Sequence, residues 1–187
     1  WPTVAVHLAL LPTGKVLSFS HGASAVVWDP ATATFVGVPN TRTDLYCAGH
    51  SALADGTLLV IGGHPPTGPG IPDVNGFDPQ SQSWTIVPSM NFGRWYPTAT
   101  TLPDGRLLAT SGAQGCLSCF VQTPEIYNPA TSSWIQLTSA NSSIPLYPYM
   151  FVLPDGRILQ AGDSEEATIT QALDLTTQSW TAVDPMV

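Results

Sequence analysis

A unit of about fifty residues occurs four times along this chain of 187 residues, and this repetition restricts the fold more than any other feature. Each unit starts with an apolar segment around a turn glycine. These segments are LPTGKVL at 11–17, LADGTLL at 53–59, LPDGRLL at 102–108 and LPDGRIL at 153–159. Their glycines, spaced 42, 49 and 51 residues apart, are Gly14, Gly56, Gly105 and Gly156.

A second element follows in each unit and ends on an aromatic residue. It reads WDPATATF at 28–35, FDPQSQSW at 77–84, YNPATSSW at 127–134 and LDLTTQSW at 173–180. This period, with short apolar strands between Asp-Gly and Asp-Pro or Asn-Pro turns, is typical of a kelch-type propeller blade. The repeated residues have structural roles in such a blade, because Asp-Gly makes turns, Pro ends strands and Trp packs between sheets.

We therefore predict an all-β fold, a kelch-like β-propeller with four blade-like repeats of four antiparallel strands. The repeats cover about 1–40, 41–90, 91–140 and 141–187. Propellers usually have four to eight blades, so four repeats could close a ring. However, the first repeat begins at its inner strand and the fourth ends at its outer one, with no strand exchanged between the termini. We expect the first part of a larger propeller, or a chain that associates to complete one.

Composition restricts the partners and the location of the protein. There are 5 Lys and Arg against 13 Asp and Glu, a formal net charge of −8, with no basic run. This balance argues against nucleic acid or an anionic membrane surface as a partner, and no apolar run is long enough to span a membrane. The chain starts at Trp1 without a Met or a leader, and Asn141 begins an Asn-Ser-Ser glycosylation sequence. We expect a mature, extracellular or secreted protein.

The chain contains three cysteines. Cys116 and Cys119 form a C-L-S-C pair, close enough for a local disulfide or for half of a metal site. No second Cys or His pair occurs at zinc-finger spacing, which disfavours zinc. Cys47 is then left over, and an odd cysteine in a secreted protein needs an explanation.

Four residues share one register on the expected inner strands, nine positions before the turn glycine. They are Ala5, Cys47, Tyr96 and Tyr147. Inner strands of successive blades lie side by side around the propeller axis, so equivalent positions gather at one mouth of the channel. We expect Cys47 and Tyr96 to be neighbours there. The second strand of each unit returns to the same mouth, and the residues expected at its end are His21, His64, Gln114 and Asp163.

Each of these residues also has an ordinary structural interpretation. A cysteine on an inner strand is more often a small buried hydrophobe than a nucleophile, and a tyrosine beside a channel usually packs its ring and hydrogen-bonds its hydroxyl. His64, within GGHPPTGPG, can be a simple loop residue. His7 and His50 stand at strand positions where a neutral, hydrogen-bonded histidine is the default. Taken singly, none of these residues supports a function.

Two consecutive repeats together carry a specific pattern. DLYCAGHSALADGTLLVIGG at 44–63 is followed one repeat later by GRWYPTATTLPDGRLLATSG at 93–112. This pattern resembles the copper radical oxidases, the galactose oxidase and glyoxal oxidase family, and RWYP is more similar to the glyoxal oxidase branch. The resemblance covers all four repeats, with specific motifs in these two strands. It implies the N-terminal portion of a larger, seven-bladed propeller.

In that family, a cysteine and a tyrosine of these two strands become joined by a thioether, and the tyrosine is a copper ligand that carries a stable radical. The resemblance implies that Cys47 is the cross-linking cysteine and Tyr96 the radical tyrosine, with Cys116 then paired to Cys119. Oxidation of an alcohol or aldehyde removes two electrons and Cu(II) accepts one, so the tyrosine supplies the second hole. The implied reaction oxidises a primary alcohol or aldehyde with O2 and releases H2O2.

The sequence also departs from the family's pattern. The family's copper site needs a second, axial tyrosine followed by a histidine, and a further histidine, all from later blades, whereas no Tyr-His dipeptide occurs here. The position of the tryptophan that stacks over the cross-link in galactose oxidase falls at Gln114, which departs from a galactose-like substrate preference. The family's C-terminal immunoglobulin-like domain lies outside this sequence. We expect little or no activity from the isolated chain.

Two other classes of function fit the repeats. A non-catalytic kelch propeller would bind a protein or a glycan through loops such as HPPTGPGIPDVNG at 64–76. It would keep Cys47 as a free thiol and Tyr96 unmodified. A self-assembling extracellular structural protein would instead associate through the open edges of its terminal repeats.

Overall fold

The computed structural model describes residues 1–187 except 66–67, 163–168 and 185–187, and the described residues form sixteen strands and no helix. The strands make four antiparallel sheets of four, and each sheet uses four strands that are consecutive in the chain. The predicted all-β fold with four-stranded repeats is confirmed. Because the described residues contain no helix, none of them belongs to a helix that could cross a membrane.

One sheet falls within each expected repeat. The first sheet contains β1 (His7–Leu10), β2 (Val16–Phe19), β3 (Ala25–Asp29) and β4 (Thr34–Gly37). The second contains β5 (Gly49–Ala52), β6 (Leu58–Ile61), β7 (Val74–Asp78) and β8 (Ser83–Val87). The third contains β9 (Thr98–Thr101), β10 (Leu107–Thr110), β11 (Glu125–Asn128) and β12 (Ser133–Gln136). The fourth contains β13 (Met150–Val152), β14 (Ile158–Gln160), β15 (Thr170–Asp174) and β16 (Ser179–Asp184).

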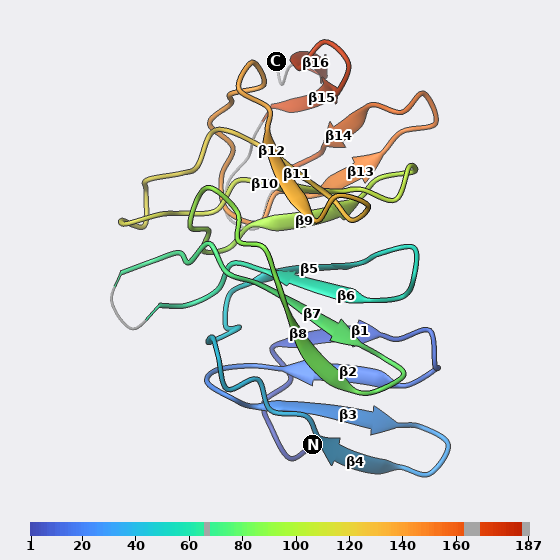
Figure 1. The fold of residues 1–187 in the computed structure, drawn as a ribbon. Helices are drawn as coiled ribbons and strands as arrows, with labels where there is room; N and C mark the ends of the chain where they lie inside the picture. The colour runs from blue at the N-terminus through green and yellow to red at the C-terminus, as the bar shows by residue number, and fades with distance from the viewer. Residues whose placement is uncertain (66–67, 163–168, 185–187) are drawn as a thin grey trace.

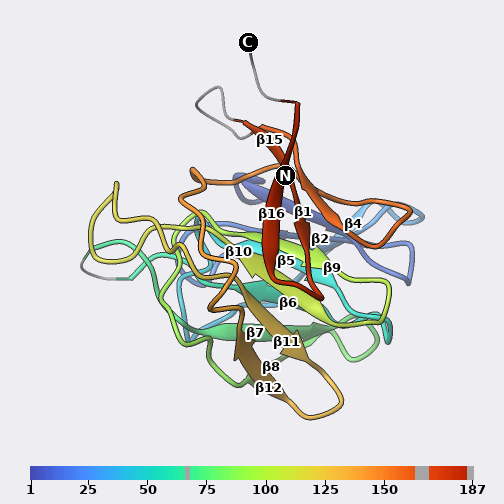
Figure 2. The same cartoon turned by 90° about the horizontal axis from the view of Figure 1, so that it is seen from above.

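The four sheets lie one above another in chain order, from the blue first sheet to the orange and red fourth (Figure 1). Seen from above, they are rotated relative to one another, as propeller blades are (Figure 2). The inner strands β5 and β9 approach closely, because a Cβ added to Gly49 would lie 2.6 Å from the Pro97 carbonyl oxygen. Only glycine fits at this contact between the second and third sheets.

A separate apolar core fills each space between neighbouring sheets. In β6, Leu58 and Val60 belong to the core against the first sheet, whereas Leu59 and Ile61 belong to the core against the third. Successive side chains of a strand point to opposite faces. A sheet covered on both faces therefore has continuous apolar second strands, and this explains the runs LLVI and LLAT.

The closing aromatic residue of the second, third and fourth units forms a hydrogen bond with the preceding unit. The indole N–H groups of Trp84, Trp134 and Trp180 donate to the carbonyl oxygens of Val38, Pro88 and Ala140, at 2.7, 2.8 and 2.8 Å. Phe35 has the same place in the first unit but no N–H group, and its ring packs against that of Trp1 with centroids 5.1 Å apart. The tryptophans thus join the sheets as well as filling the space between them.

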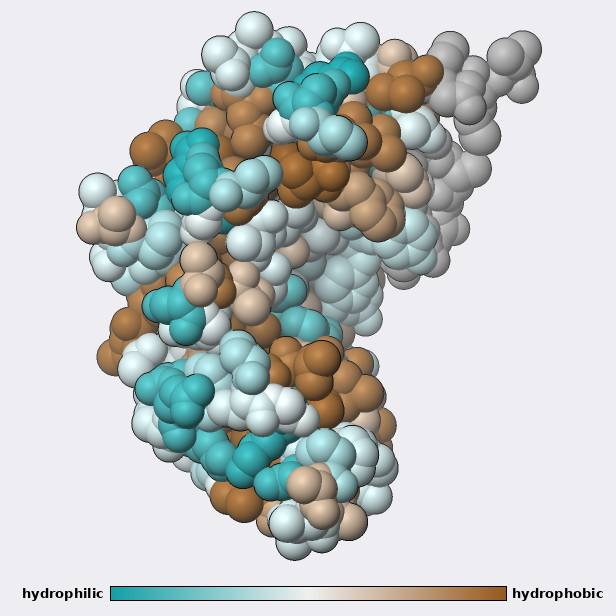
Figure 3. Space-filling view, turned by 90° about the vertical axis from the view of Figure 1, so that its right-hand side faces the viewer, coloured by the Kyte–Doolittle hydropathy of each residue, from teal (hydrophilic) through white to brown (hydrophobic). Residues whose placement is uncertain are grey.

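The first and fourth sheets each expose apolar side chains among the described residues. Leu8 and Leu10 of β1 are 49% and 76% exposed, and Phe151 of β13 is 55% exposed. The space-filling view shows a curved outline with apolar patches on its surface (Figure 3). Both ends of the stack therefore present surface on which further protein could pack.

Candidate active site

Three of the four residues in the shared register meet at one end of the inner strands. The backbone N–H of Tyr96 donates to the carbonyl oxygen of Cys47 at 2.8 Å, and that of Tyr147 donates to the carbonyl oxygen of Tyr96 at 2.9 Å. Cys47 and Tyr96 are thus neighbours on adjacent units, as the register predicts. Ala5, the fourth member, does not line the cavity at this end.

A cavity of about 380 Å³, here named the mouth cavity, opens where these strands begin. Its lining residues are Val6, His7, Tyr46, Cys47, Ala48, Gly49, His50, Tyr96, Pro97, Thr98, Ala99 and Tyr147. The lining combines aromatic and aliphatic surface with a thiol, three phenols and two imidazoles. Such a cavity suits a small molecule that has a polar group to be oriented.

The register residues share an unusual backbone conformation. Cys47, Tyr96 and Tyr147 have φ angles of 62°, 61° and 46°, in the left-handed region that side chains other than glycine rarely occupy. Each stands two or three residues before its inner strand. Such residues occur preferentially at functional sites, where the surrounding structure holds them in place.

The left-handed conformation of Tyr96 changes which side chains it contacts. In an extended strand Trp95 and Tyr96 would point to opposite faces. Instead their rings stack, with centroids 3.9 Å apart and planes inclined by 10°. The Tyr147 ring also stacks on Tyr96, at 4.5 Å and 20°. Tyr96 therefore lies between two nearly parallel aromatic rings, and Trp95 is a site residue to which the sequence analysis assigned no role.

Cys47 is a free thiol and is only 2% exposed. Burial raises the pKa of this thiol to about 11, against an opposing effect of hydrogen bonds with the side chains of Tyr96 and Tyr46. Cys47 is therefore a neutral thiol at physiological pH, and its sulfur lies within hydrogen-bonding reach of the Tyr96 side chain. Tyr96 is one of three aromatic side chains, with Tyr46 and Trp95, that surround the sulfur.

Tyr147 is a second phenol beside Tyr96. Its hydroxyl donates to the carbonyl oxygen of Ala48 at 3.1 Å. Burial raises its pKa above the ordinary tyrosine value, and the neighbouring Cys47 and Tyr96 act in the same direction. Tyr147 thus stays a neutral phenol that is tied to the backbone of the cysteine strand.

Two neutral histidines, His7 and His50, also line the mouth cavity. Burial lowers the pKa of His7 to about 4, with His50 as a second cause, and burial also lowers the pKa of His50. Their rings are 5.6 Å apart at nearly a right angle, and His7 stacks on Phe19 at 4.7 Å. The buried Nε2 of His7 has no hydrogen-bond partner among the described residues, which differs from the hydrogen-bonded histidine expected there.

His64 lies in a neighbouring cavity of about 500 Å³ that also includes Asp44. Its backbone N–H donates to the Asp44 carbonyl oxygen at 3.0 Å. His21, the equivalent residue of the first unit, bonds to the Asp44 carboxylate through Nδ1 at 3.1 Å and stacks on Tyr46 at 3.5 Å. Because Tyr46 also lines the mouth cavity, these histidines lie one side chain away from Cys47.

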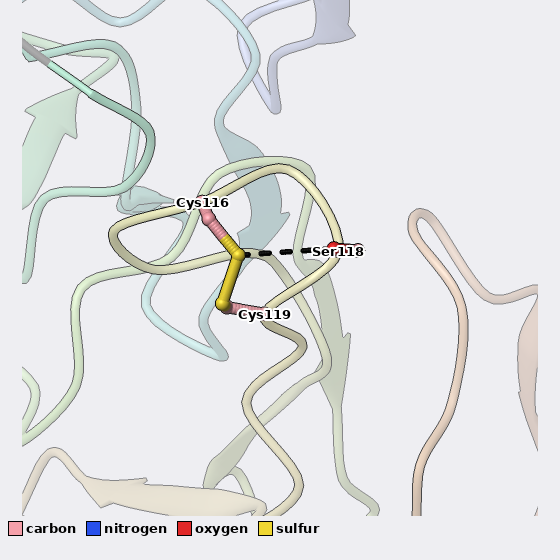
Figure 4. Close-up of a disulfide and its surroundings, with 3 residues drawn as sticks. All are labelled: Cys116, Ser118 and Cys119. Atoms are coloured by element: carbon pink, nitrogen blue, oxygen red, sulfur yellow. Dashed lines mark hydrogen bonds between the residues drawn. A yellow bond between two sulfur atoms is a disulfide. The ribbon is translucent and has the colours of Figure 1, made fainter.

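Gln114 lines neither cavity. It is exposed and lies two residues before the disulfide between Cys116 and Cys119, which has Ser118 beside its sulfur atoms (Figure 4). The Gln114 backbone N–H donates to the carbonyl oxygen of Cys119 at 3.0 Å. Asp163 lies outside the described residues. Asn141 is exposed, and its amide oxygen accepts a hydrogen bond from Thr123 at 2.7 Å.

A buried ion pair lies directly before the Trp95–Tyr96 stack. Arg94 Nη2 and Glu125 Oε2 are 2.9 Å apart, and both side chains are 0% exposed. Burial lowers the pKa of the Arg94 guanidinium, and the carboxylate of Glu125 opposes this shift. The sequence did not indicate this pair, because the two residues are 31 positions apart and an isolated arginine is usually exposed.

The described residues do not form a metal site by themselves. No group of three or more His, Cys, Asp or Glu side chains among them could hold a metal ion. Tyr96 lines the mouth cavity, and a phenolate oxygen beside imidazoles suits Cu(II). Tyr96 is therefore one candidate ligand, and a complete coordination sphere needs donors beyond these residues.

The known proteins that are similar to this chain include two oxidases. A galactose oxidase from Gibberella zeae is 28% identical over 87% of this chain and 27% of its own length. An aldehyde oxidase from Vitis pseudoreticulata is 28% identical over 81% of this chain and 29% of its own. The chain thus spans less than a third of either relative.

A solved structure has the same fold. It is described as a novel fungal alcohol oxidase with catalytic diversity among the AA5 family, in complex with copper, and it matches with a TM-score of 0.78 at 22% identity. The match covers 99% of this chain and 42% of that one. A family model described as the glyoxal oxidase N-terminus matches residues 10–173, which is most of the chain. The chain therefore belongs to the glyoxal oxidase N-terminus family.

Proposed function

We propose that this chain is the N-terminal propeller portion of a copper radical oxidase. The full-length protein oxidises a primary alcohol or an aldehyde, transfers two electrons and two protons to O2, and releases H2O2. The observation that carries the proposal is the contact between Cys47 and Tyr96. A buried thiol and a phenol on adjacent strands lie within hydrogen-bonding reach at the mouth cavity.

The proposed cofactor is a thioether between Cys47 and Tyr96. Its formation replaces the S–H bond of the cysteine and one ring C–H bond of the tyrosine by a C–S bond. The two protons and two electrons that these bonds release reduce O2 to H2O2. Sulfur on the ring lowers the oxidation potential of Tyr96, and the stacked rings of Trp95 and Tyr147 shield the ring from water.

Copper, when bound, supplies a one-electron acceptor that acts together with the tyrosine. Tyr96 would hold it through the phenolate oxygen and would take the hydrogen from the substrate C–H bond. The remaining ligands in the family's pattern, a second tyrosine and two histidines, would come from later blades. We expect the isolated chain to be inactive, because one phenolate does not define a coordination geometry.

The disulfide between Cys116 and Cys119 supports an extracellular location, since disulfides persist in oxidising compartments. The substrate class is a small alcohol or aldehyde, or the hydroxymethyl group of a glycan. The mouth cavity, of about 380 Å³, supports this assignment by its size and by its mixed lining.

The test is the intact mass of the protein extended by the later blades that carry the remaining copper ligands, measured after exposure to Cu(II) and O2, denaturation and full reduction. Reduction opens the disulfide, whereas a thioether survives and leaves the mass about two units low. We expect this deficit, mapped to a linked peptide that contains Cys47 and Tyr96, with Cys116 and Cys119 alkylatable and Cys47 not.

Three variants identify the reacting tyrosine. Tyr96→Phe should abolish the deficit, whereas Tyr46→Phe and Tyr147→Phe should keep it, although all three phenols line the same cavity. A full mass of the extended wild-type protein, with Cys47 alkylatable as well as Cys116 and Cys119, would contradict the oxidase and favour a propeller that binds protein or glycan.

A further inference from the structure

The Arg94–Glu125 pair carries an energetic cost that stability alone does not explain. Both side chains are 0% exposed, and Arg94 is among the largest fully buried side chains of the protein. Removing two charges from water costs free energy that their attraction repays only with good geometry and complete hydrogen bonding. An apolar pair of the same volume would usually serve stability as well. The pair therefore has a use in the geometry that it imposes.

The pair ties three segments of the third unit together. Arg94 Nη1 donates to the carbonyl oxygen of Ser111 at 2.6 Å, and Nη2 donates to that of Thr123 at 2.7 Å. The second carboxylate oxygen of Glu125 accepts from the backbone N–H and the side-chain amide of Asn91, both at 2.7 Å. The loop before β9, the end of β10 and the start of β11 thus meet at one guanidinium.

Only Trp95 separates Arg94 from Tyr96. The Trp95 N–H donates to the Ala113 carbonyl oxygen at 2.9 Å, and the Ala113 N–H donates to the Trp95 carbonyl oxygen at 2.7 Å. The next N–H, that of Tyr96, donates to the Cys47 carbonyl oxygen. Every backbone group along this short path is therefore fixed. Arg94 and the left-handed residue Tyr96 thus belong to one hydrogen-bonded segment.

The hydrogen bonds of Arg94 also extend to the segment whose ring packs on the other face of Tyr96. The Ser111 hydroxyl lies within hydrogen-bond distance of the carbonyl oxygens of Ile144 and Pro145, at 2.6 and 2.7 Å. These two residues lead directly into Leu146 and Tyr147. Arg94, through Ser111, thus holds the segment that carries the second stacked ring.

The backbone around Arg94 has no room to adjust. A Cβ added to Gly62 would overlap the Arg94 carbonyl oxygen, and one added to Gly112 would lie 2.9 Å from the Arg94 Cβ. Both glycines have positive φ angles, of 72° and 91°. The close packing means that Arg94 fits in one position only.

We infer that Arg94 and Glu125 are positioning residues that hold the Tyr96 ring at bonding distance from the Cys47 sulfur. The inference rests on the proposed function, since the bond in question is the thioether. Formation of a covalent bond depends steeply on geometry, and a displacement of about 1 Å can cost about 100-fold in rate. The pair thus sets the rate at which the cofactor forms, although neither residue touches the reacting atoms.

The experiment compares cross-linking rates in variants of the same extended protein, purified without copper and then given Cu(II) and O2. Arg94→Lys keeps the charge, but a single ammonium cannot span the three acceptors that the planar guanidinium holds. We expect the two-unit mass deficit to appear about 10-fold more slowly or worse. Glu125→Gln keeps the shape and an acceptor for Asn91, and provides the second test if the lysine variant does not fold.

Two controls separate positioning from stability. Arg106→Lys changes an exposed arginine of the same unit, paired with Asp104, and should cross-link at the wild-type rate. Leu173→Ala removes a buried side chain from the fourth sheet and lowers stability far from Tyr96. If it slows cross-linking as much as Arg94→Lys, or if both folded variants of the pair react at the wild-type rate, the inference is wrong.

A second readout needs no copper. In the folded wild-type chain, alkylation of the buried Cys47 by iodoacetamide should be slow, and in Arg94→Lys we expect it to be about 10-fold faster because the packing around the sulfur is loosened. An extended wild-type protein that never cross-links would disprove the proposed function. The alkylation rates would then decide the positioning role alone, and equal rates would overturn it.

Discussion

At the scale of single residues, the site depends on backbone conformations that cost free energy. A residue other than glycine in the left-handed region costs about 1 kcal/mol or more. Cys47, Tyr96 and Tyr147 all take this cost at equivalent positions, and a chain of backbone hydrogen bonds joins them. The cost is offset by packing around the mouth cavity, so the site and its scaffold stabilise one another.

The neutral side chain of His7 makes the free energy of unfolding depend on pH. The pKa of His7 is lowered to about 4, whereas an unfolded chain protonates it near 6.5. Between these two pH values the unfolded state binds more protons at His7 than the folded state does. The contribution of neutral His7 to the free energy of unfolding is therefore complete above pH 6.5 and is lost as the pH falls toward 4. The slope for one histidine is at most about 1.4 kcal/mol per pH unit.

Urea unfolding at pH 7 and pH 5 measures this slope. His7→Gln removes the titrating group, and we expect a shallower loss of stability than in wild type. A residual slope should remain, because the pKa of His50 is lowered as well. An unchanged slope in the variant would show that His7 is not responsible.

The site shows which residues a sequence can predict. The meeting of Cys47, Tyr96 and Tyr147 could be predicted by counting from the turn glycines, since this requires only that equivalent strands lie side by side. The stack of Trp95 on Tyr96 could not, because strand alternation places consecutive side chains on opposite faces. The burial of Arg94 could not either, since its partner Glu125 is brought to it only by the fold.

At the scale of elements, the sheets are joined through the closing tryptophans. Trp134→Phe keeps most of the packing and removes the hydrogen bond from Nε1 to the Pro88 carbonyl oxygen. A hydrogen bond of this kind contributes about 1 kcal/mol. We expect the free energy of unfolding to fall by about 1–2 kcal/mol, measured by denaturant titration.

The equivalent substitutions provide a comparison. Trp84→Phe and Trp180→Phe remove hydrogen bonds of nearly the same length and should have similar effects. A loss for Trp134→Phe that is much larger than for the other two would mean that the repeats are not equivalent in how they are joined.

The turns were predictable at this scale, because their chemistry is local. Asp55, Asp104 and Asp155 each accept a hydrogen bond from the backbone N–H two residues later, as Asp-Gly turns do. The loop that contains Gln114 was not predictable in the same way. Its course depends on the Cys116–Cys119 disulfide and on the bridge from Trp95 to Ala113, which carry it away from the mouth cavity.

At the scale of the whole molecule, the exposed faces of the terminal sheets favour association. Leu8 and Leu10 on the first sheet, and Phe151 on the fourth, are about half or more exposed. Apolar patches of this kind mark surfaces that pack against protein. We expect the isolated chain to associate with increasing concentration, measured by sedimentation velocity.

Charged substitutions test which surface is responsible. Leu10→Lys combined with Phe151→Lys should shift the chain toward monomer. Ile86→Lys, which changes an equally exposed apolar residue on β8 of the second sheet, should not. A wild-type chain that remains monomeric at high concentration would contradict association through these faces.

The tryptophan hydrogen bonds also follow the order in which the chain is synthesised. Each donor lies in a later unit and each acceptor in the unit before it, so during translation the acceptor has already left the ribosome when its tryptophan emerges. A nascent chain can therefore add one folded unit at a time onto a finished neighbour. Synonymous codons that change the speed of translation between units would then change the yield of native protein without changing its sequence.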